Sequence, residues 1–285
     1  MTRILILGAD TVAGRSLAQR FAEHSDVSAL WFRTAEPIVG CRVTHLTGTS
    51  LATEVAAADV VVFCGDASRS SWDDRFGQFS AERRWLQKCV DAVSATNRRL
   101  VYISSDAVFC GPWVFHDDNS RSLAHDPVAR TLLKYEDLVA SVRDSLIVRT
   151  NIVSCDDGSF LRKAVDRLVS QRTVTVDAGT YGTPLSADEF AVSVEQCLSS
   201  NLSGYVNVGG AERTTPFHLA VSLASALNVG TNRLQPKASD GQTTERSLRC
   251  QRLRTELHRQ APLLKETLES LSALVPEQLE AAVAA

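Results

Sequence analysis

The chain has 285 residues, of which 44% are hydrophobic and 22% are charged, and its formal net charge is −3 at pH 7. This composition is ordinary for a globular protein with a large core, and the near-neutral charge excludes a global field that would attract nucleic acid or an anionic membrane. No stretch is long and apolar enough to span a bilayer, and residues 4–7 are too few for the apolar region of a secretory signal. The seven cysteines are scattered, and no two have the spacing of a metal site. We therefore expect free thiols in a cytoplasmic protein, with no metal and with neither nucleic acid nor membrane as a partner.

The first half of the chain alternates short apolar runs with helical patterns. Strands are predicted over residues 3–8, 27–32, 42–46, 59–64, 100–105 and 145–149, and helices over residues 14–24 and 79–95. Continuous apolar strands separated by helices are typical of a parallel sheet covered on both faces. We predict a doubly wound α/β fold in which the strands beginning near residues 3, 59, 100 and 145 are adjacent and parallel.

After residue 151 the rhythm changes, and shorter strands alternate with helices. Helices are predicted over residues 160–171, 187–199, 216–227 and 248–271, and strands over residues 173–176 and 205–208. The segment 234–246 is polar and contains Pro236 and Gly241, so we expect a loop or a mobile lid there. We assign residues 1–150 to a dinucleotide-binding core and residues 151–285 to a smaller α/β substrate-binding lobe with the C-terminal helices, the two forming one unit.

Gly8 and Gly14 flank the turn between the first strand and the first helix. Glycines allow a tight turn and a close approach of the backbone to a pyrophosphate, and the helix N-terminus supplies N–H donors and a favourable dipole. We therefore expect the pyrophosphate of a dinucleotide to lie over residues 8–14, with Thr11 and Val12 among the binding residues. The alternative is a strand–helix turn that no longer binds a dinucleotide.

Arg33 follows the second strand. A carboxylate at this place hydrogen-bonds the ribose 2′-hydroxyl of NAD, whereas an arginine suits the 2′-phosphate of NADP. Arg33 therefore favours NADP over NAD, and the alternative is an arginine in a solvated loop.

Residues 101–111 form a hydrophobic strand that continues into the segment Ser-Ser-Asp-Ala-Val-Phe-Cys-Gly. This segment resembles the Ser-Thr-Asp-Tyr-Val-Phe-Asp-Gly segment of the dTDP-4-dehydrorhamnose reductases, which are NAD(P)H-dependent sugar-nucleotide reductases of the extended short-chain dehydrogenase family. The resemblance continues through residues 148–151, 181–187 and 204–208, and it covers most of the chain in order. It implies a Rossmann-type core, NADP or NAD as the cofactor and a sugar nucleotide as a ligand.

The same resemblance places the catalytic serine or threonine at Ser105 and the catalytic lysine at Lys134. The chemistry needs a tyrosine four residues before the lysine, so that both side chains share one helix face and the phenol protonates the substrate carbonyl oxygen as hydride arrives. Arg130 occupies that position, and no Tyr-x-x-x-Lys motif exists in the chain. A guanidinium does not give up its proton near neutral pH, so Arg130 cannot replace the tyrosine as an acid.

Other positions of the implied site are altered as well. The resemblance places Thr11 at the middle glycine of the phosphate-binding motif, and Cys64 and Gly65 where relatives have an Asn-Ala pair against the cofactor. It also places Ser80 where an asparagine supports the lysine, and Ala107 where a tyrosine follows the serine motif. We therefore expect hydride transfer by the usual route to be lost, with dinucleotide binding retained or, as the alternative, weakened or lost.

Two functional hypotheses follow from these residues. In the first, the protein keeps a nucleotide or sugar-nucleotide pocket and acts by binding, as a regulatory or scaffolding partner of another protein. In the second, it is a working NADP-dependent reductase of sugar nucleotides or small ketones, in which Arg130 orients an anionic substrate and water or Ser105 donates the proton. A nicotinamide-dependent turnover assay separates the two.

Overall fold

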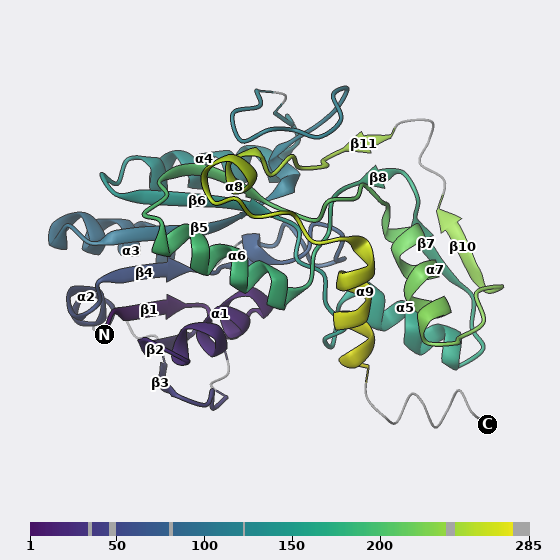
Figure 1. Ribbon diagram of the computed structural model, residues 1–285, viewed down its shortest axis with the longest axis horizontal. Coiled ribbons are helices and arrows are strands. Elements are labelled where there is room, and N and C mark those ends of the chain that lie inside the picture. The colour runs from purple at the N-terminus through teal and green to yellow at the C-terminus, as the bar shows by residue number, and fades with distance from the viewer. Residues whose placement is uncertain (34–35, 46–49, 80–81, 122, 238–242, 276–285) are drawn as a thin grey trace.

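The computed structural model describes residues 1–33, 36–45, 50–79, 82–121, 123–237 and 243–275. Its centre is a seven-stranded sheet in the order β3-β2-β1-β4-β5-β6-β9, and every pair of neighbouring strands is parallel (Figure 1). The strands are β1 (Arg3–Leu7), β2 (Asp26–Trp31), β3 (Cys41–His45), β4 (Val60–Phe63), β5 (Arg99–Ser105), β6 (Ser145–Thr150) and β9 (Gly204–Val208). The prediction that β1, β4, β5 and β6 are adjacent and parallel is confirmed.

Helices cover both faces of this sheet because alternate residues of each buried strand point to opposite sides. One face packs against α1 (Val12–Ala22) and α6 (Ala187–Ser199), and the other packs against α2 (Ser50–Ala57), α3 (Glu82–Thr96) and α4 (Pro127–Ala140). The Rossmann-type α/β fold expected from the sequence is therefore present. Helix α2 had no counterpart among the predicted elements.

A smaller lobe lies beyond the carboxyl ends of the strands, to the right of the sheet in Figure 1. It has its own apolar core and two small parallel sheets, β10–β7 and β11–β8. Its elements are α5 (Phe160–Val169), β7 (Val174–Asp177), β8 (Thr180–Tyr181), α7 (Pro216–Ala226), β10 (Leu234–Lys237), β11 (Thr244–Glu245) and α9 (Leu264–Ala273). The chain returns to the central sheet between these elements, since β9 follows α6 and pairs with β6.

Two predicted elements of the later segment differ from the structure. The segment 234–246, expected to be a loop or lid, contributes β10 and β11 to the lobe, and residues 238–242 lie outside the described part. The polar side chains hide these strands in the sequence because their backbone pairing, and not an apolar pattern, defines them. The single helix predicted over residues 248–271 is two helices, α8 (Gln251–Glu256) and α9, separated by a stretch that contains Pro262.

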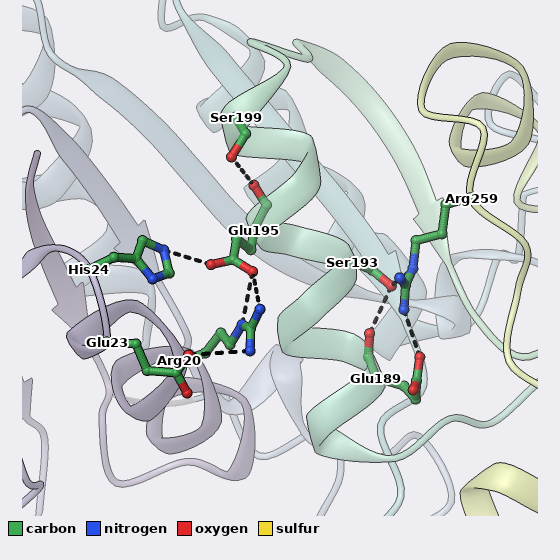
Figure 2. A network of polar contacts seen from close by, with 8 residues as sticks. All are labelled: Arg20, Glu23, His24, Glu189, Ser193, Glu195, Ser199 and Arg259. Atoms are coloured by element: carbon green, nitrogen blue, oxygen red, sulfur yellow. Dashed lines mark hydrogen bonds and ion pairs between the residues drawn. The ribbon is translucent and has the colours of Figure 1, made fainter.

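Figure 2 shows how α6 is tied to α1 on one side and to the segment after α8 on the other. Glu195 of α6 accepts a hydrogen bond from Arg20 Nε at 2.8 Å and lies 2.6 Å from His24 Nε2. Six residues earlier in the same helix, Glu189 accepts from Arg259 Nη2 at 2.6 Å. These contacts fix the segment between α8 and α9 against the Rossmann core. In the described ranges, no helix is long and apolar enough to cross a membrane.

Candidate functional site

The turn between β1 and α1 brings three backbone segments into direct contact. Gly8 has a φ of +85°, and a Cβ at that position would lie 1.9 Å from the carbonyl oxygen of Cys64. A Cβ on Gly14 would lie 2.2 Å from the carbonyl oxygen of Gly8. Only glycine fits at these two positions, and the resulting geometry is that of a phosphate-binding turn.

Thr11 is the N-cap residue of α1, and its side chain is buried. Its Oγ1 accepts a hydrogen bond from Gly14 N at 3.0 Å and donates one to Gly8 O at 2.8 Å. The cap therefore uses one of the first-turn amides, while those of Val12 and Ala13 have no acceptor within the helix. These two amides and the helix dipole can bind an anion at the N-terminus of α1.

A cleft of about 480 Å³ begins at this turn and reaches the loop after β6. Thr11 and Val12 line one end, and Ser70 and Ile152 line the part nearest to β5 and β6. Its charged lining residues are Asp10, Arg15, Arg33, Glu36, Arg69, Asp73, Arg75, Asp156 and Asp157. Because acidic groups outnumber arginines, a pyrophosphate in this cleft would depend on the α1 amides rather than on a positive field.

A second hollow of about 90 Å³ adjoins the turn on the side of β2 and β4, and we call it the β2–β4 pocket. Its lining residues are Asp10, Thr11, Phe32, Arg33, Gly65, Asp66, Glu82 and Trp85. Aromatic rings, a guanidinium and hydrogen-bond acceptors next to a phosphate-binding turn suit a nucleoside. In chemical type, the residues present therefore suit the adenosine half of a dinucleotide.

Glu82 at the start of α3 is the buried acid of this pocket. Its carboxylate accepts hydrogen bonds from Ala67 N at 3.1 Å and from the Tyr102 hydroxyl at 3.2 Å. Burial, with a smaller contribution from the charge of Asp66, raises the pKa of Glu82 to about 8. A Cβ on Gly65 would lie 2.3 Å from the Glu82 Cδ atom, so Gly65 is what allows Glu82 to reach this place.

Ser105 ends β5 at the carboxyl edge of the sheet, where ligands of open α/β folds bind. Its side chain is fully buried, its Oγ accepts from Ala107 N at 3.2 Å, and it donates to Asp106 Oδ1 at 3.3 Å. Burial raises the pKa of Asp106 to about 6, and the charge of Arg246 partly offsets this effect. The hydroxyl thus caps the 3-10 turn over Asp106–Val108.

Helix α4 presents apolar side chains to the end of β5. Asp126 caps the helix and Pro127 starts it, as their types favour. Leu132 is fully buried in the same apolar cluster as Ala107. One turn earlier, Val128 lies against Gly77, where an added Cβ would be 2.9 Å from Val128 Cγ2.

A buried ion pair fixes the rotation of α4 about its axis. Arg149 of β6 donates to Glu136 of α4 through Nε at 3.0 Å and Nη2 at 2.7 Å, and Ser104 donates to the same carboxylate at 2.7 Å. The guanidinium of Arg149 also lies over the rings of Phe109 and Tyr205, at 4.9 and 4.5 Å from their centroids. With Glu136 held against the sheet, Leu132 one turn earlier faces inward, and Val128 one turn before that is half-buried beside this face.

A family model described as the RmlD substrate binding domain matches residues 1–274 of the chain. The chain belongs to this family. Its predicted resemblance to dTDP-4-dehydrorhamnose reductases is thereby confirmed, although no curated protein matches its sequence.

Several solved structures share the fold of this chain. A dTDP-4-dehydrorhamnose reductase from Bacillus anthracis, in complex with NADP, is 19% identical with a TM-score of 0.75, over 95% of this chain and 98% of that one. A dTDP-glucose 4,6-dehydratase, DesIV from Streptomyces venezuelae, with NAD and TYD bound, is 17% identical with a TM-score of 0.79, over 95% and 96% of the two chains. At these identities the likeness establishes the fold alone.

Within this RmlD-family fold, the structure does not bring all the predicted site residues together. Arg130 and Lys134 are exposed, and each lies about 160° from Leu132 around the helix axis, since a helix has 3.6 residues per turn. They therefore lie on the face of α4 opposite to Leu132, and their predicted roles in a site at Ser105 stay predictions. The buried residues of α4 are Ala129, Leu132, Tyr135, Glu136 and Val139.

The predicted cofactor residues are placed more favourably. Gly8, Thr11, Val12 and Gly14 form the turn, and Arg33 and Gly65 line the β2–β4 pocket. Cys64 is different, because its thiol is buried in the sheet core and only its carbonyl reaches the turn. Ser80 lies outside the described residues.

Sequence reasoning missed three further groups. Asp66, Glu82 and Trp85 line the β2–β4 pocket, and no motif pointed to them. The available signal was position, because Asp66 follows β4 at the carboxyl edge of the sheet and Glu82 begins the next helix. Throughout the described ranges, no group of three or more His, Cys, Asp or Glu side chains could hold a metal ion, and no disulfide is present.

Proposed function

We propose that this RmlD-family protein binds a nicotinamide dinucleotide, together with a sugar nucleotide or similar ligand, and acts by binding rather than by Ser-Tyr-Lys hydride transfer. The observation that carries this proposal is the inward face of α4. Val128 and Leu132 stand four residues apart on that face, where a tyrosine and a lysine would both have to face Ser105. Neither aliphatic side chain can donate a proton or lower the pKa of a donor.

The dinucleotide part of the proposal rests on the turn and the pocket beside it. The amides of Val12 and Ala13 would hold the pyrophosphate, and Arg33, Asp66 and Trp85 would surround the adenosine. A nicotinamide cofactor supplies or accepts hydride when bound. Structures of the same fold in complex with NADP and with NAD support such a ligand as the first choice.

The binding role is proposed because the pocket lacks the tyrosine that would protonate the substrate. Positioned general-acid catalysis contributes on the order of 10²–10⁴ in rate, so its loss leaves a site that holds ligands but turns them over slowly. A protein whose bound state differs from its free state can report ligand concentration to another protein. We therefore propose a regulatory or scaffolding role toward a protein partner.

The experiment combines binding with turnover on the full chain. Calorimetric titration with NAD⁺, NADP⁺ and dTDP-glucose is expected to show binding of a dinucleotide. Oxidation of NADH or NADPH in the presence of a dTDP-4-keto-6-deoxysugar is expected to stay at background. Absence of dinucleotide binding would refute the retained pocket, and robust turnover that Ser105→Ala abolishes would refute the binding-only role.

A matched pair of variants tests the position of the lost groups. The double variant V128Y/L132K places the donor and the lysine on the inward face, whereas Arg130→Tyr places a tyrosine beside Lys134 on the exposed face. We expect measurable NAD(P)H oxidation only in the double variant, provided that its circular dichroism and thermal unfolding show a folded protein. Rescue by Arg130→Tyr would contradict the orientation of α4.

One observation favours a second function, reduction by a variant mechanism. Asp106 adjoins Ser105, and burial raises its pKa to about 6, so a carboxylic acid is available at this sheet edge in mildly acidic solution. Arg130 would have no part in it, because it lies on the exposed face of α4. Wild-type turnover that declines above about pH 6 and disappears in Asp106→Asn would establish this route.

A further inference from the structure

Arg33, which the sequence analysis assigned to a 2′-phosphate, already forms an ion pair with a carboxylate. Arg33 Nη2 lies 2.9 Å from Asp66 Oδ1, and Arg69 Nε lies 3.0 Å from the same oxygen. The side chain of Asp66 is 16% exposed, whereas that of Arg33 is 58% exposed. Asp66 is therefore the fixed member of this ion pair, and Arg33 is the member that extends into solvent.

The other ionisable side chains that line the β2–β4 pocket, those of Asp10 and Glu82, are carboxyl groups. Asp10 lines it and accepts a hydrogen bond from Phe32 N at 3.1 Å, and Glu82 lines its buried side. Because burial raises the pKa of Glu82 to about 8, that group is mostly uncharged near pH 7. Among the residues that line this pocket, the charged carboxylates are then Asp66, which pairs with Arg33, and Asp10.

The ion pair lies across the phosphate-binding turn. Arg33 follows β2 and Asp66 follows β4, and these two strands flank β1 in the sheet. A ribose with free hydroxyls can donate to the carboxylate and accept from the guanidinium while both keep their charges compensated. A 2′-phosphate would instead have to draw Arg33 away from Asp66 and lie beside that carboxylate, where like charges repel.

We infer that this site selects dinucleotides whose adenosine ribose is unphosphorylated, NAD(H) over NADP(H), and that Asp66 is the residue that excludes the 2′-phosphate. The inference rests on the proposed function, because it concerns the same dinucleotide pocket. It reverses the preference for NADP that Arg33 indicated in the sequence, since the sequence did not show the carboxylate bound to that arginine.

The test compares ligands that differ only in the 2′-phosphate. Calorimetric titration at pH 7 with NAD⁺ and NADP⁺, and with ADP-ribose and its 2′-phosphate, reads binding without any turnover. We expect wild type to bind the unphosphorylated member of each pair at least tenfold more tightly. In Asp66→Asn, which keeps the size of the side chain, the ratio should fall by tenfold or more.

Asp157→Asn is the matched control, because Asp157 lines the neighbouring cleft but not the β2–β4 pocket. It removes the same charge and should change both affinities alike, leaving their ratio as in wild type. Tighter binding of NADP⁺ than of NAD⁺ by wild type, or an unchanged ratio in Asp66→Asn, would overturn the inference while leaving the proposed binding function intact. Failure of all four ligands to bind would overturn the proposed function and the inference with it.

Discussion

Two regions at the same edge of the sheet, the β1–α1 turn and the inward face of α4, differ in what they retain. At the turn, Gly8 and Gly14 keep the close backbone contacts of a phosphate-binding turn, although the Thr11 hydroxyl already accepts from the Gly14 amide. On α4, Glu136 keeps the helix in position, but the side chains that reach the end of β5 are aliphatic. Helix position and catalytic chemistry therefore depend on separate residues, and one can be lost while the other remains.

The largest expected effect concerns the turn. Gly8→Ala should prevent folding or lower the free energy of unfolding by more than about 4 kcal/mol, because the new Cβ meets a backbone carbonyl and not a movable side chain. Gly204→Ala is the matched control, with a φ of +76° but no atom within 4 Å of the added Cβ. It should lose only about 1–2 kcal/mol from backbone strain. Similar losses in the two variants, measured by denaturant unfolding, would contradict the close contact at the turn.

The second prediction concerns the ion pair that positions α4. Glu136→Ala leaves the buried Arg149 guanidinium without its carboxylate, so the free energy of unfolding should fall by about 3–5 kcal/mol. Glu256→Ala breaks an exposed pair with Arg252 of similar length and should lose under about 1 kcal/mol. If Glu136→Ala were as mild as the control, α4 would not be held by this pair, and its orientation would need another cause.

The third prediction concerns the β2–β4 pocket, where the titration of Glu82 should make the free energy of unfolding depend on pH. The folded protein holds the Glu82 proton up to about pH 8, whereas the unfolded chain releases it near 4.5. Between these values the folded state binds more protons, so stability falls as pH rises, by at most about 1.4 kcal/mol per unit. Below the lower value both states are protonated, and above the upper value both are ionised.

Glu82→Gln removes this titration, so its free energy of unfolding should rise relative to wild type as the pH increases across that window. Asp106, which titrates lower, is present in both proteins and cancels in the comparison. Parallel pH profiles of wild type and variant would show that Glu82 is ionised at neutral pH. The β2–β4 pocket would then carry a further negative charge.

The fourth prediction concerns whether the Thr11 hydroxyl lowers the affinity of the turn for a dinucleotide by occupying the Gly14 amide. Thr11→Gly releases the Gly14 amide from the threonine hydroxyl, and loss of the cap should lower stability by only a few tenths of a kcal/mol. With a third first-turn amide available, dinucleotide affinity should increase severalfold in calorimetry. Thr215→Gly removes the matching cap of α7, away from the turn, and should leave affinity unchanged. Equal affinity of wild type and Thr11→Gly would show that the threonine does not compete with the ligand.

The parts of the molecule differ in how well the sequence predicted them. Strands β1, β4, β5 and β6 were predictable because each is a continuous apolar run between helices, and the turn was predictable because glycine spacing reports backbone geometry directly. The face of α4 that packs against the sheet was not predictable. The motif comparison relied on Lys134, the lysine within this helix, whereas the buried pair Glu136–Arg149 sets which face is inward, and its two residues are more than 10 positions apart in the sequence. Likewise, the carboxylate beside Arg33 comes from a different strand end, and a motif in one segment cannot show it.

The smallest expected effect is also the most direct test of α4. Arg130 and Lys134 are exposed on the face of α4 opposite to Leu132, so Arg130→Ala and Lys134→Ala should each change stability by no more than about 0.5 kcal/mol and leave dinucleotide affinity as in wild type. Leu132→Ala, on the opposite face of the same turn, removes a fully buried side chain and should lose about 2–5 kcal/mol. A catalytic lysine that contacts a bound cofactor would behave differently, because its removal weakens binding even where the fold is unchanged. A clear loss of dinucleotide affinity in Lys134→Ala, with normal thermal unfolding, would therefore return Lys134 to the site and contradict the orientation of α4 on which the proposed function depends.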